Sequence, residues 1–179
     1  MDDDSRYGPD QAVYSGHTRL VDEHTWQFRV PTPSDRERWG ALYRGYADFY
    51  GVDQTDQAAD LVWSWIQDPD HEVECLLVVD AADQPVGLAH HRPFARPLSA
   101  TTGCFLDDLF VDPDHRGSGA ADALLAELQR IAGVRGWSVV RWITAEDNYR
   151  GRAKYDQHAR RTAWVTYDMA PAALQVPLS

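Results

Sequence analysis

The sequence predicts a single α/β domain in which a mixed central sheet is flanked by helices. Segments with strand and helix periodicity follow one another in the order strand, two helices, three strands, helix, strand, helix, strand. The 179 residues, of which 44% are hydrophobic, suffice for one sizeable core but not for two. A long helix at residues 118–135 lies between two of the strands, and we expect it to cross over between parallel neighbours.

The first half of the chain has the pattern of a strand, two helices and a pair of strands. Residues 25–30 (TWQFRV) alternate as a short strand does. Ser34, with Glu37 three residues later, forms a capping-box pattern that starts the first helix. Residues 55–67 (TDQAADLVWSWIQ) predict a second helix, and residues 72–94 contain two strands joined by a turn.

The second half begins with an apolar run at residues 103–111 (GCFLDDLFV), which predicts a buried strand. The helix at residues 118–135 has one continuous apolar stripe. Residues 137–144 (WSVVRWIT) predict a further strand, and residues 148–159 predict a short helix. Residues 161–169 (RTAWVTYDM) predict a closing strand.

The ends of the chain lie outside this pattern. Residues 1–24 show no clear periodicity, so we expect an N-terminal extension that is mobile or loosely docked. The domain then occupies residues 25–170, and residues 171–179 form a C-terminal tail.

Composition excludes several classes of protein. The formal net charge of −11 argues against a nucleic-acid partner, because a phosphate backbone is bound by an excess of Lys and Arg. No segment approaches the roughly 18 consecutive apolar residues of a membrane span, and the N-terminus lacks the apolar run of a signal peptide. Cys75 and Cys104 lie in apolar runs, which suits buried thiols in a reducing compartment. We therefore expect a cytoplasmic protein that binds neither nucleic acid nor membrane.

A glycine-rich segment, RGSGAA at residues 116–121, joins the strand at residues 103–111 to the long helix. Backbone N–H groups at a helix start lack intrahelical partners and lie at the positive end of the helix dipole, so this segment predicts an anion site. Gly117 and Gly119 let the backbone approach the anion closely. The small side chains of Ser118, Ala120 and Ala121 leave room for a diphosphate.

Three phosphate-binding patterns compete for this segment. A Walker loop is excluded, because no lysine follows Gly119. A dinucleotide-binding fingerprint fits poorly, because Asp122 occupies the third glycine position and the segment lies late in the chain. The third pattern, Arg-x-x-Gly-x-Ala, is met by Arg116, Gly119 and Ala121.

With this loop the sequence resembles the GNAT superfamily of N-acetyltransferases over residues 28–169. A second motif agrees, since Asn148, Tyr155 and the following DQHA resemble the superfamily pattern Asn-x-x-Ala-x-x-Phe-Tyr-x-x-x-Gly. The chain departs from that pattern at three positions: Gly151 for Ala, Lys154 for Phe and Ala159 for Gly. Because Asp107 and Asp108 form an acidic pair in the strand at residues 103–111, the chain most resembles the diamine (polyamine) acetyltransferase-like branch.

The resemblance implies a GNAT acyl-CoA N-acyltransferase fold and an enzyme that transfers the acetyl group of acetyl-CoA to a primary amine. The expected acceptor is a small molecule, acetylated by direct transfer in a ternary complex, and relatives suggest a homodimer. By resemblance, the backbone of Leu109, Phe110 and Val111 pairs with the pantetheine arm. Asn148 contacts the pantetheine or phosphate side, and Tyr155 acts as general acid on the thiolate. The pyrophosphate is expected at Arg116, Gly117, Ser118, Gly119, Ala120, Ala121 and Asp122.

Two adjacent aspartates are candidates for the general base. Alternation along a strand sends Asp107 and Asp108 to opposite faces unless a bulge intervenes, so at most one is expected at the reaction. By position, the resemblance assigns the role to Asp107, acting through water, with Asp108 as the reserve. Alternatively, both are structural carboxylates bonded to backbone or Arg.

Several alternatives remain open. Tyr155 could be a core tyrosine, and Tyr46, Phe49 or Tyr50 could contact substrate. His90 and His91 should face opposite ways, and with no third ligand at metal spacing we expect no metal. Peptide or protein N-acetylation competes with small-amine acetylation, and a non-catalytic domain that senses acyl-CoA is the rival from another class.

Overall fold

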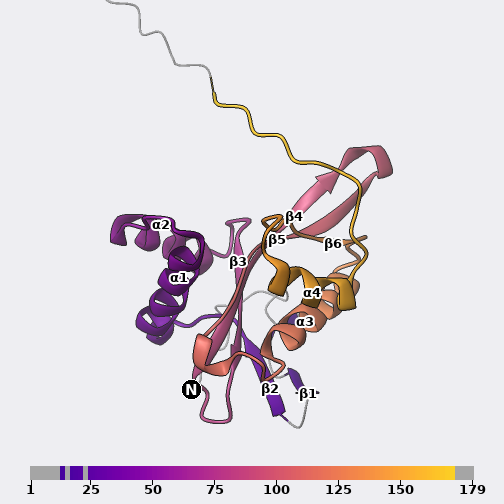
Figure 1. Cartoon of the computed structure of the whole chain (residues 1–179). Helices are drawn as coiled ribbons and strands as arrows, with labels where there is room; N and C mark the ends of the chain where they lie inside the picture. The colour runs from indigo at the N-terminus through magenta and orange to yellow at the C-terminus, as the bar shows by residue number, and fades with distance from the viewer. Residues whose placement is uncertain (1–12, 15–16, 22–23, 172–179) are drawn as a thin grey trace, which may run out of the picture.

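A six-stranded sheet forms the centre of the computed structural model, which describes residues 13–14, 17–21 and 24–171 (Figure 1). The strands lie in sequence order, and every neighbouring pair is antiparallel except β5 and β6, which are parallel. Their bounds are β1 His17–Val21, β2 His24–Arg29, β3 Glu74–Val79, β4 Pro85–Arg96, β5 Thr101–Val111 and β6 Val140–Arg141. The parallel pair is joined by the long helix, which confirms the predicted crossover.

Helices cover both faces of the sheet. Figure 1 shows α1 (Arg36–Tyr50) and α2 (Asp56–Gln67) on one side and α3 (Ala120–Val134) and α4 (Tyr149–His158) on the other. All four predicted helices are therefore present. The start of the first helix differs from the prediction, because the capping box is formed by Thr32 and Asp35, two residues earlier, at the short 3₁₀ helix Pro33–Asp35. There the Asp35 carboxylate accepts a hydrogen bond from the backbone N–H of Thr32 at 2.7 Å.

The two layers of helices bury two apolar clusters, one on each face of the sheet. Along β3, Leu76 and Val78 point into the cluster beneath α3, whereas Leu77 and Val79 point into the cluster beneath α1. All four are fully buried. This strand is apolar on both faces because helices cover both.

Two predicted strands differ in the structure. The strand expected at residues 137–144 is reduced to the two residues Val140–Arg141. The closing strand expected at residues 161–169 does not form, and this stretch is exposed and without regular structure. Trp164 and Tyr167, for example, are 85% and 87% exposed. Strand propensity is present in both stretches, but a strand also needs a neighbour to pair with.

The N-terminal segment also differs from the prediction. β1 lies within residues 1–24, where an extension was expected, yet it pairs with β2 along its whole length. Tyr14 is only 2% exposed and belongs to the cluster beneath α3. Residues 1–12 lie outside the described residues, so the prediction is corrected for the described part alone. Across the described residues, no helix combines the length and hydrophobicity that a membrane crossing requires.

Candidate active site

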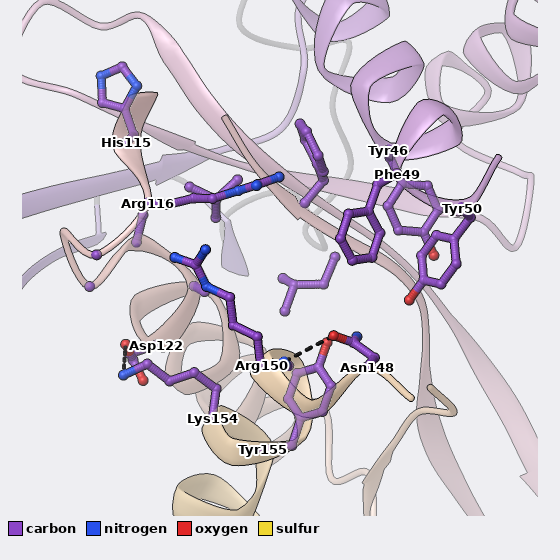
Figure 2. Close-up of a pocket in the computed structure, with 18 residues that line it drawn as sticks. Tyr46, Phe49, Tyr50, His115, Arg116, Asp122, Asn148, Arg150, Lys154 and Tyr155 are labelled. Atoms are coloured by element: carbon purple, nitrogen blue, oxygen red, sulfur yellow. Dashed lines mark hydrogen bonds and ion pairs between the residues drawn. The ribbon is translucent and has the colours of Figure 1, made fainter. Parts of the chain in front are cut away.

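A pocket of about 250 Å³ opens where β5 ends and α3 begins. In Figure 2, aromatic side chains from the end of α1 face Asn148 and Tyr155 of the α4 region, and Arg116 and Arg150 extend into the space between. Four separate segments of the chain therefore meet at this pocket. Its lining is Tyr46, Phe49, Tyr50, Leu109, Phe110, Val111, His115, Arg116, Gly117, Gly119, Ala120, Ala121, Asp122, Asn148, Arg150, Gly151, Lys154 and Tyr155.

The end of β5 presents a backbone edge to this pocket. On one side, Leu109, Phe110 and Val111 pair with Ala89, Leu88 and Gly87 of β4. On the other side, the described pairing with β6 covers Cys104 and Phe105 alone, and the last residues of β5 line the pocket. An open strand edge of this kind can accept an extended, amide-containing molecule as an added strand.

The glycine segment continues from that edge. Gly117 and Gly119 have φ angles of +85° and +83°, a left-handed conformation that few residues other than glycine adopt. Gly119 is the N-cap of α3, so the first N–H groups of the helix lie next to the pocket. The Ser118 hydroxyl instead donates to the carbonyl of His115 at 2.6 Å, and Ser118 is the one predicted loop residue that does not line the pocket.

Asp122 lines the pocket but carries two partners from α4. Its carboxylate lies 2.9 Å from Nζ of Lys154 and 2.7 Å from Nε2 of His158. Burial alone would raise the pKa of Asp122, but His158 and Lys154 outweigh burial and lower it. The carboxylate thus ties α3 to α4, and Lys154 offsets its negative charge beside the predicted anion site.

Asn148 has a structural role at the same pocket. Its side chain caps α4 by accepting from the backbone N–H of Gly151 at 3.0 Å, and it donates to Oγ1 of Thr144 at 3.0 Å. A Cβ at position 151 would lie 2.5 Å from Nδ2 of Asn148. The glycine that departs from the superfamily pattern therefore makes room for the Asn148 side chain.

Tyr155 belongs both to the core and to the pocket. Its ring packs against Trp142 at 5.3 Å in an edge arrangement, and the residue also lines the pocket. Burial first, and Tyr50 second, raise the pKa of Tyr155. The hydroxyl therefore stays protonated at neutral pH and can serve as a proton donor.

A bulge in β5 decides where the two aspartates point. His90 pairs with Asp108 and His91 pairs with Leu106, so Asp107 is an extra residue in β5. Asp108 contacts His90, and Asp107 contacts Arg92. His90 and Arg92 are two residues apart on β4 and share a face, so both carboxylates lie on that face. Opposite faces are expected only in the absence of a bulge, and this bulge breaks the alternation.

The two carboxylates differ in their partners. Oδ2 of Asp108 lies 2.8 Å from Nδ1 of His90. Burial first, and the charge of Asp108 second, raise the pKa of the nearby Tyr46 hydroxyl. Asp107 lies 3.2 Å from Nε of Arg92. Burial is the main cause that raises the pKa of Asp107; Arg92 opposes it and the charge of Asp108 adds to it. Neither aspartate lines the pocket, but their neighbours Leu109 and Tyr46 do.

The two adjacent histidines face opposite sides of the sheet, as predicted. His90 accepts from Nε1 of Trp39 in α1, whereas His91 contacts the hydroxyl of Tyr14 beneath α3. Within the described part of the chain, no group of three or more metal-binding side chains comes together.

Sequence reasoning missed three basic side chains of the pocket, two from α4 and one from the loop before α3. His115, Arg150 and Lys154 line the pocket without having been predicted there. The basic residues in NYRGRAK could have indicated Arg150 and Lys154, because Arg and Lys side chains are the expected partners of a bound anion.

Comparison with known proteins identifies relatives of this chain. A family model described as the acetyltransferase (GNAT) family matches residues 39–159, more than half of the chain. The D-amino-acid N-acetyltransferase HPA3 of Saccharomyces cerevisiae is 24% identical over 136 residues, which cover 75% of this chain and 84% of that protein.

Solved structures share the fold. A ribosomal-protein-alanine N-acetyltransferase of Brucella melitensis is similar with a TM-score of 0.69 at 23% identity, covering 82% of this chain and 99% of that one. The aminoglycoside N-acetyltransferase AAC(6')-Iy in complex with CoA gives a TM-score of 0.70 at 17% identity, covering 88% and 99%. The fold is therefore that of these acetyltransferases.

Proposed function

This chain belongs to the acetyltransferase (GNAT) family, and we propose that it acetylates a small primary amine by direct transfer in a ternary complex. Family membership makes it an acetyl-CoA-dependent N-acetyltransferase, with acetyl-CoA as the acyl donor. The nature of the amine and the route of transfer are inferred from the geometry of the site.

The observation that carries the proposal is the continuity of the open β5 edge with the glycine loop in one pocket. The strand edge suits the amide groups of a pantetheine arm, and the loop N–H groups at the start of α3 suit a pyrophosphate. Arg116 and Arg150 add positive charge near that end. The donor would thus lie along the pocket with its thioester toward Leu109 and Tyr155.

The reaction then needs a base, an acid and a stabilised oxyanion. Asp107, acting through water, takes a proton from the ammonium, and the free nitrogen attacks the thioester carbon. Backbone N–H groups of β5 stabilise the oxyanion. As the C–S bond breaks, Tyr155 gives its proton to the thiolate. The nitrogen loses two protons overall: one leaves through Asp107 to solvent, and the other replaces the proton that Tyr155 gave up.

The state of these groups supports their roles. A general base works best when its pKa lies close to the working pH, and burial moves the pKa of Asp107 in that direction. Asp108 is held by the His90 ring and is better suited to a fixed structural charge. These differences support Asp107 as the base in this proposal, with Asp108 as the reserve.

A cationic small molecule fits the acceptor side best. Two carboxylates share one face of the sheet beside Tyr43 and Tyr46, and carboxylates with aromatic rings attract an ammonium group. This supports an amine of the diamine type within the family. HPA3 is named for D-amino acids and AAC(6')-Iy for aminoglycosides, which are also small molecules.

Two alternatives would give different results in one experiment. A peptide N-acetyltransferase would leave small amines unmodified, and an acyl-CoA sensor would bind acetyl-CoA without turnover. Release of the CoA thiol in the presence of single amines, with mass spectrometry of the product, tests the proposal.

We also propose that the protein is a homodimer formed by exchange of its C-terminal segment. Trp164, Val165, Tyr167 and Met169 are 85%, 70%, 87% and 95% exposed, and Figure 1 shows the segment running away from the domain. β6 lies at the end of the sheet, with β5 as its described neighbour. In a symmetric pair, each copy adds its C-terminal segment as a strand beside the β6 edge of the other copy. This exchange covers the apolar side chains of the segment and gives the β6 edge a hydrogen-bonding partner.

A further inference from the structure

A chain of hydrogen bonds runs from the core beneath α1 to Asp108 in β5. Nε1 of Trp39 donates to Nε2 of His90 at 3.0 Å, and Nδ1 of His90 contacts Oδ2 of Asp108 at 2.8 Å. The charge of Asp108 also acts on the hydroxyl of Tyr46, which lines the pocket. Trp39 and His90 are 0% and 1% exposed, so water does not compete with the hydrogen bond between them.

The indole of Trp39 determines which nitrogen of His90 carries the proton. An indole N–H can only donate, so Nε2 of His90 must be the acceptor and cannot carry a proton. The ring is therefore neutral, and its proton lies on Nδ1, where it is donated to Asp108.

Asp108 is consequently an anion held by a neutral group. The His90 ring orients the carboxylate without cancelling its charge. Among the described residues, no Lys or Arg forms an ion pair with Asp108. The uncancelled charge stands next to Asp107, which the bulge brings to the same face.

We propose that Trp39 and His90 are positioning residues that hold Asp108 as a fixed negative charge, and that this charge makes Asp107 a stronger base toward the acceptor amine. The inference rests on the proposed function and names residues that do not touch the substrate. The titratable and charged groups around Asp107 are Arg92 and His90 from β4 and Asp108 and Cys104 from β5. Those around Asp108 are His90, Tyr43 and Tyr46, Cys75 of β3 and Asp107.

The pH dependence of kcat/KM is the activity readout. Asp107 must be ionised to accept a proton, so activity falls as the pH drops through its pKa, which gives the acid limb of the profile. Asp108→Asn removes the neighbouring charge, and the acid limb should move to lower pH, on the order of one pH unit for two charges a few Å apart. Trp39→Phe frees Nε2, so the His90 ring can change tautomer or become protonated. Either change weakens the fixed charge and shifts the limb in the same direction.

Trp63→Phe is the matched control for Trp39→Phe. The ring of Trp63 packs 5.0 Å from that of Trp39, and the Arg36 guanidinium lies over both rings. Trp63 takes no part in the hydrogen-bond chain, so Trp63→Phe changes the same aromatic cluster and leaves that chain intact. We expect the control variant to keep the wild-type acid limb. If Trp39→Phe also keeps it, or if both variants shift equally, the positioning role is wrong.

A second readout does not depend on activity. In ¹⁵N-histidine-labelled protein, long-range ¹H–¹⁵N spectra distinguish a protonated from an unprotonated ring nitrogen. For His90 at neutral pH we expect a protonated Nδ1 and an unprotonated Nε2. A proton on Nε2 would overturn the inference even in a fully active enzyme. If no amine is acetylated, the proposed function fails, while the His90 tautomer still reports separately on the hydrogen-bond chain.

Discussion

Tyr155 combines a structural and a chemical position in one side chain. Its ring packs on Trp142, and the residue lines the pocket, so removing the hydroxyl alone separates the two roles. Tyr155→Phe should leave acetyl-CoA affinity and stability close to wild type. Turnover should fall within the range of about 10²- to 10⁴-fold that is typical of general-acid catalysis, at its lower end because CoA is a fairly good leaving group. The measurement is kcat beside the acetyl-CoA dissociation constant. Wild-type turnover in the variant would mean that Tyr155 has a packing role alone. A parallel loss of acetyl-CoA affinity would mean that it binds the donor and is not the acid.

Asp107 gives a prediction with a defined pH dependence. Its raised pKa places loss of the charged form, and so loss of base function, on the acid side of the profile. Asp107→Asn should therefore lower activity more at low pH than at high pH, where free amine exists without help. Rates measured from mildly acidic to alkaline pH test this. An equal loss at every pH would indicate that Asp107 positions the substrate and does not remove a proton.

At the level of single residues, sequence reasoning identified most of the pocket. Arg116, Gly119 and Tyr155 were predicted because their chemistry depends on local sequence, a turn before a helix and a motif within one helix. The side of the sheet on which the Asp107 side chain lies depends on a bulge. A bulge is a property of two paired strands, so the sequence of one strand does not reveal it.

The glycine loop and α3 act together as one element. Gly119 caps α3 in a left-handed conformation beside the pocket, so Gly119→Glu would place bulk and negative charge at the anion site. Acetyl-CoA should raise the melting temperature of the wild-type protein, NAD and ATP should not, and the variant should lose this shift. Gly133→Glu is the matched control, because position 133 is exposed on the same helix with no atom near its Cβ. A folded Gly119→Glu protein that keeps the acetyl-CoA shift would contradict the loop assignment.

Elements were predicted well where packing and local pattern agree. The apolar stripe of α3 fits a helix with one face on the core, and the continuous apolar run of β3 fits a strand that is covered on both faces. The stretch at residues 161–169 has the composition of a strand but pairs with no strand among the described residues. β1 has little alternation in its sequence but pairs with β2. Propensity describes what a segment can form, and pairing decides what it does form.

On the scale of the whole molecule, the exposed C-terminal segment predicts the state of association. The full chain should run as a dimer in light-scattering chromatography, because exchange buries Trp164, Tyr167 and Met169. A chain ended after Ala159 should run as a monomer. Full-length protein with Trp164→Ser and Tyr167→Ser serves as the control, and it should dimerise less tightly without losing any length. A monomeric full chain, or a truncated chain that is still a dimer, would contradict strand exchange.

The most direct test of the central claim is thiol release from acetyl-CoA across a panel of small amines, with product mass determined for each. We expect release that requires a primary amine, matches the acetylated product in amount, and is fastest for cationic amines. With both substrates varied, intersecting initial-velocity lines are expected for a ternary complex. Acetyl-CoA binding without release for any amine, or acetylation confined to peptides, would contradict the account.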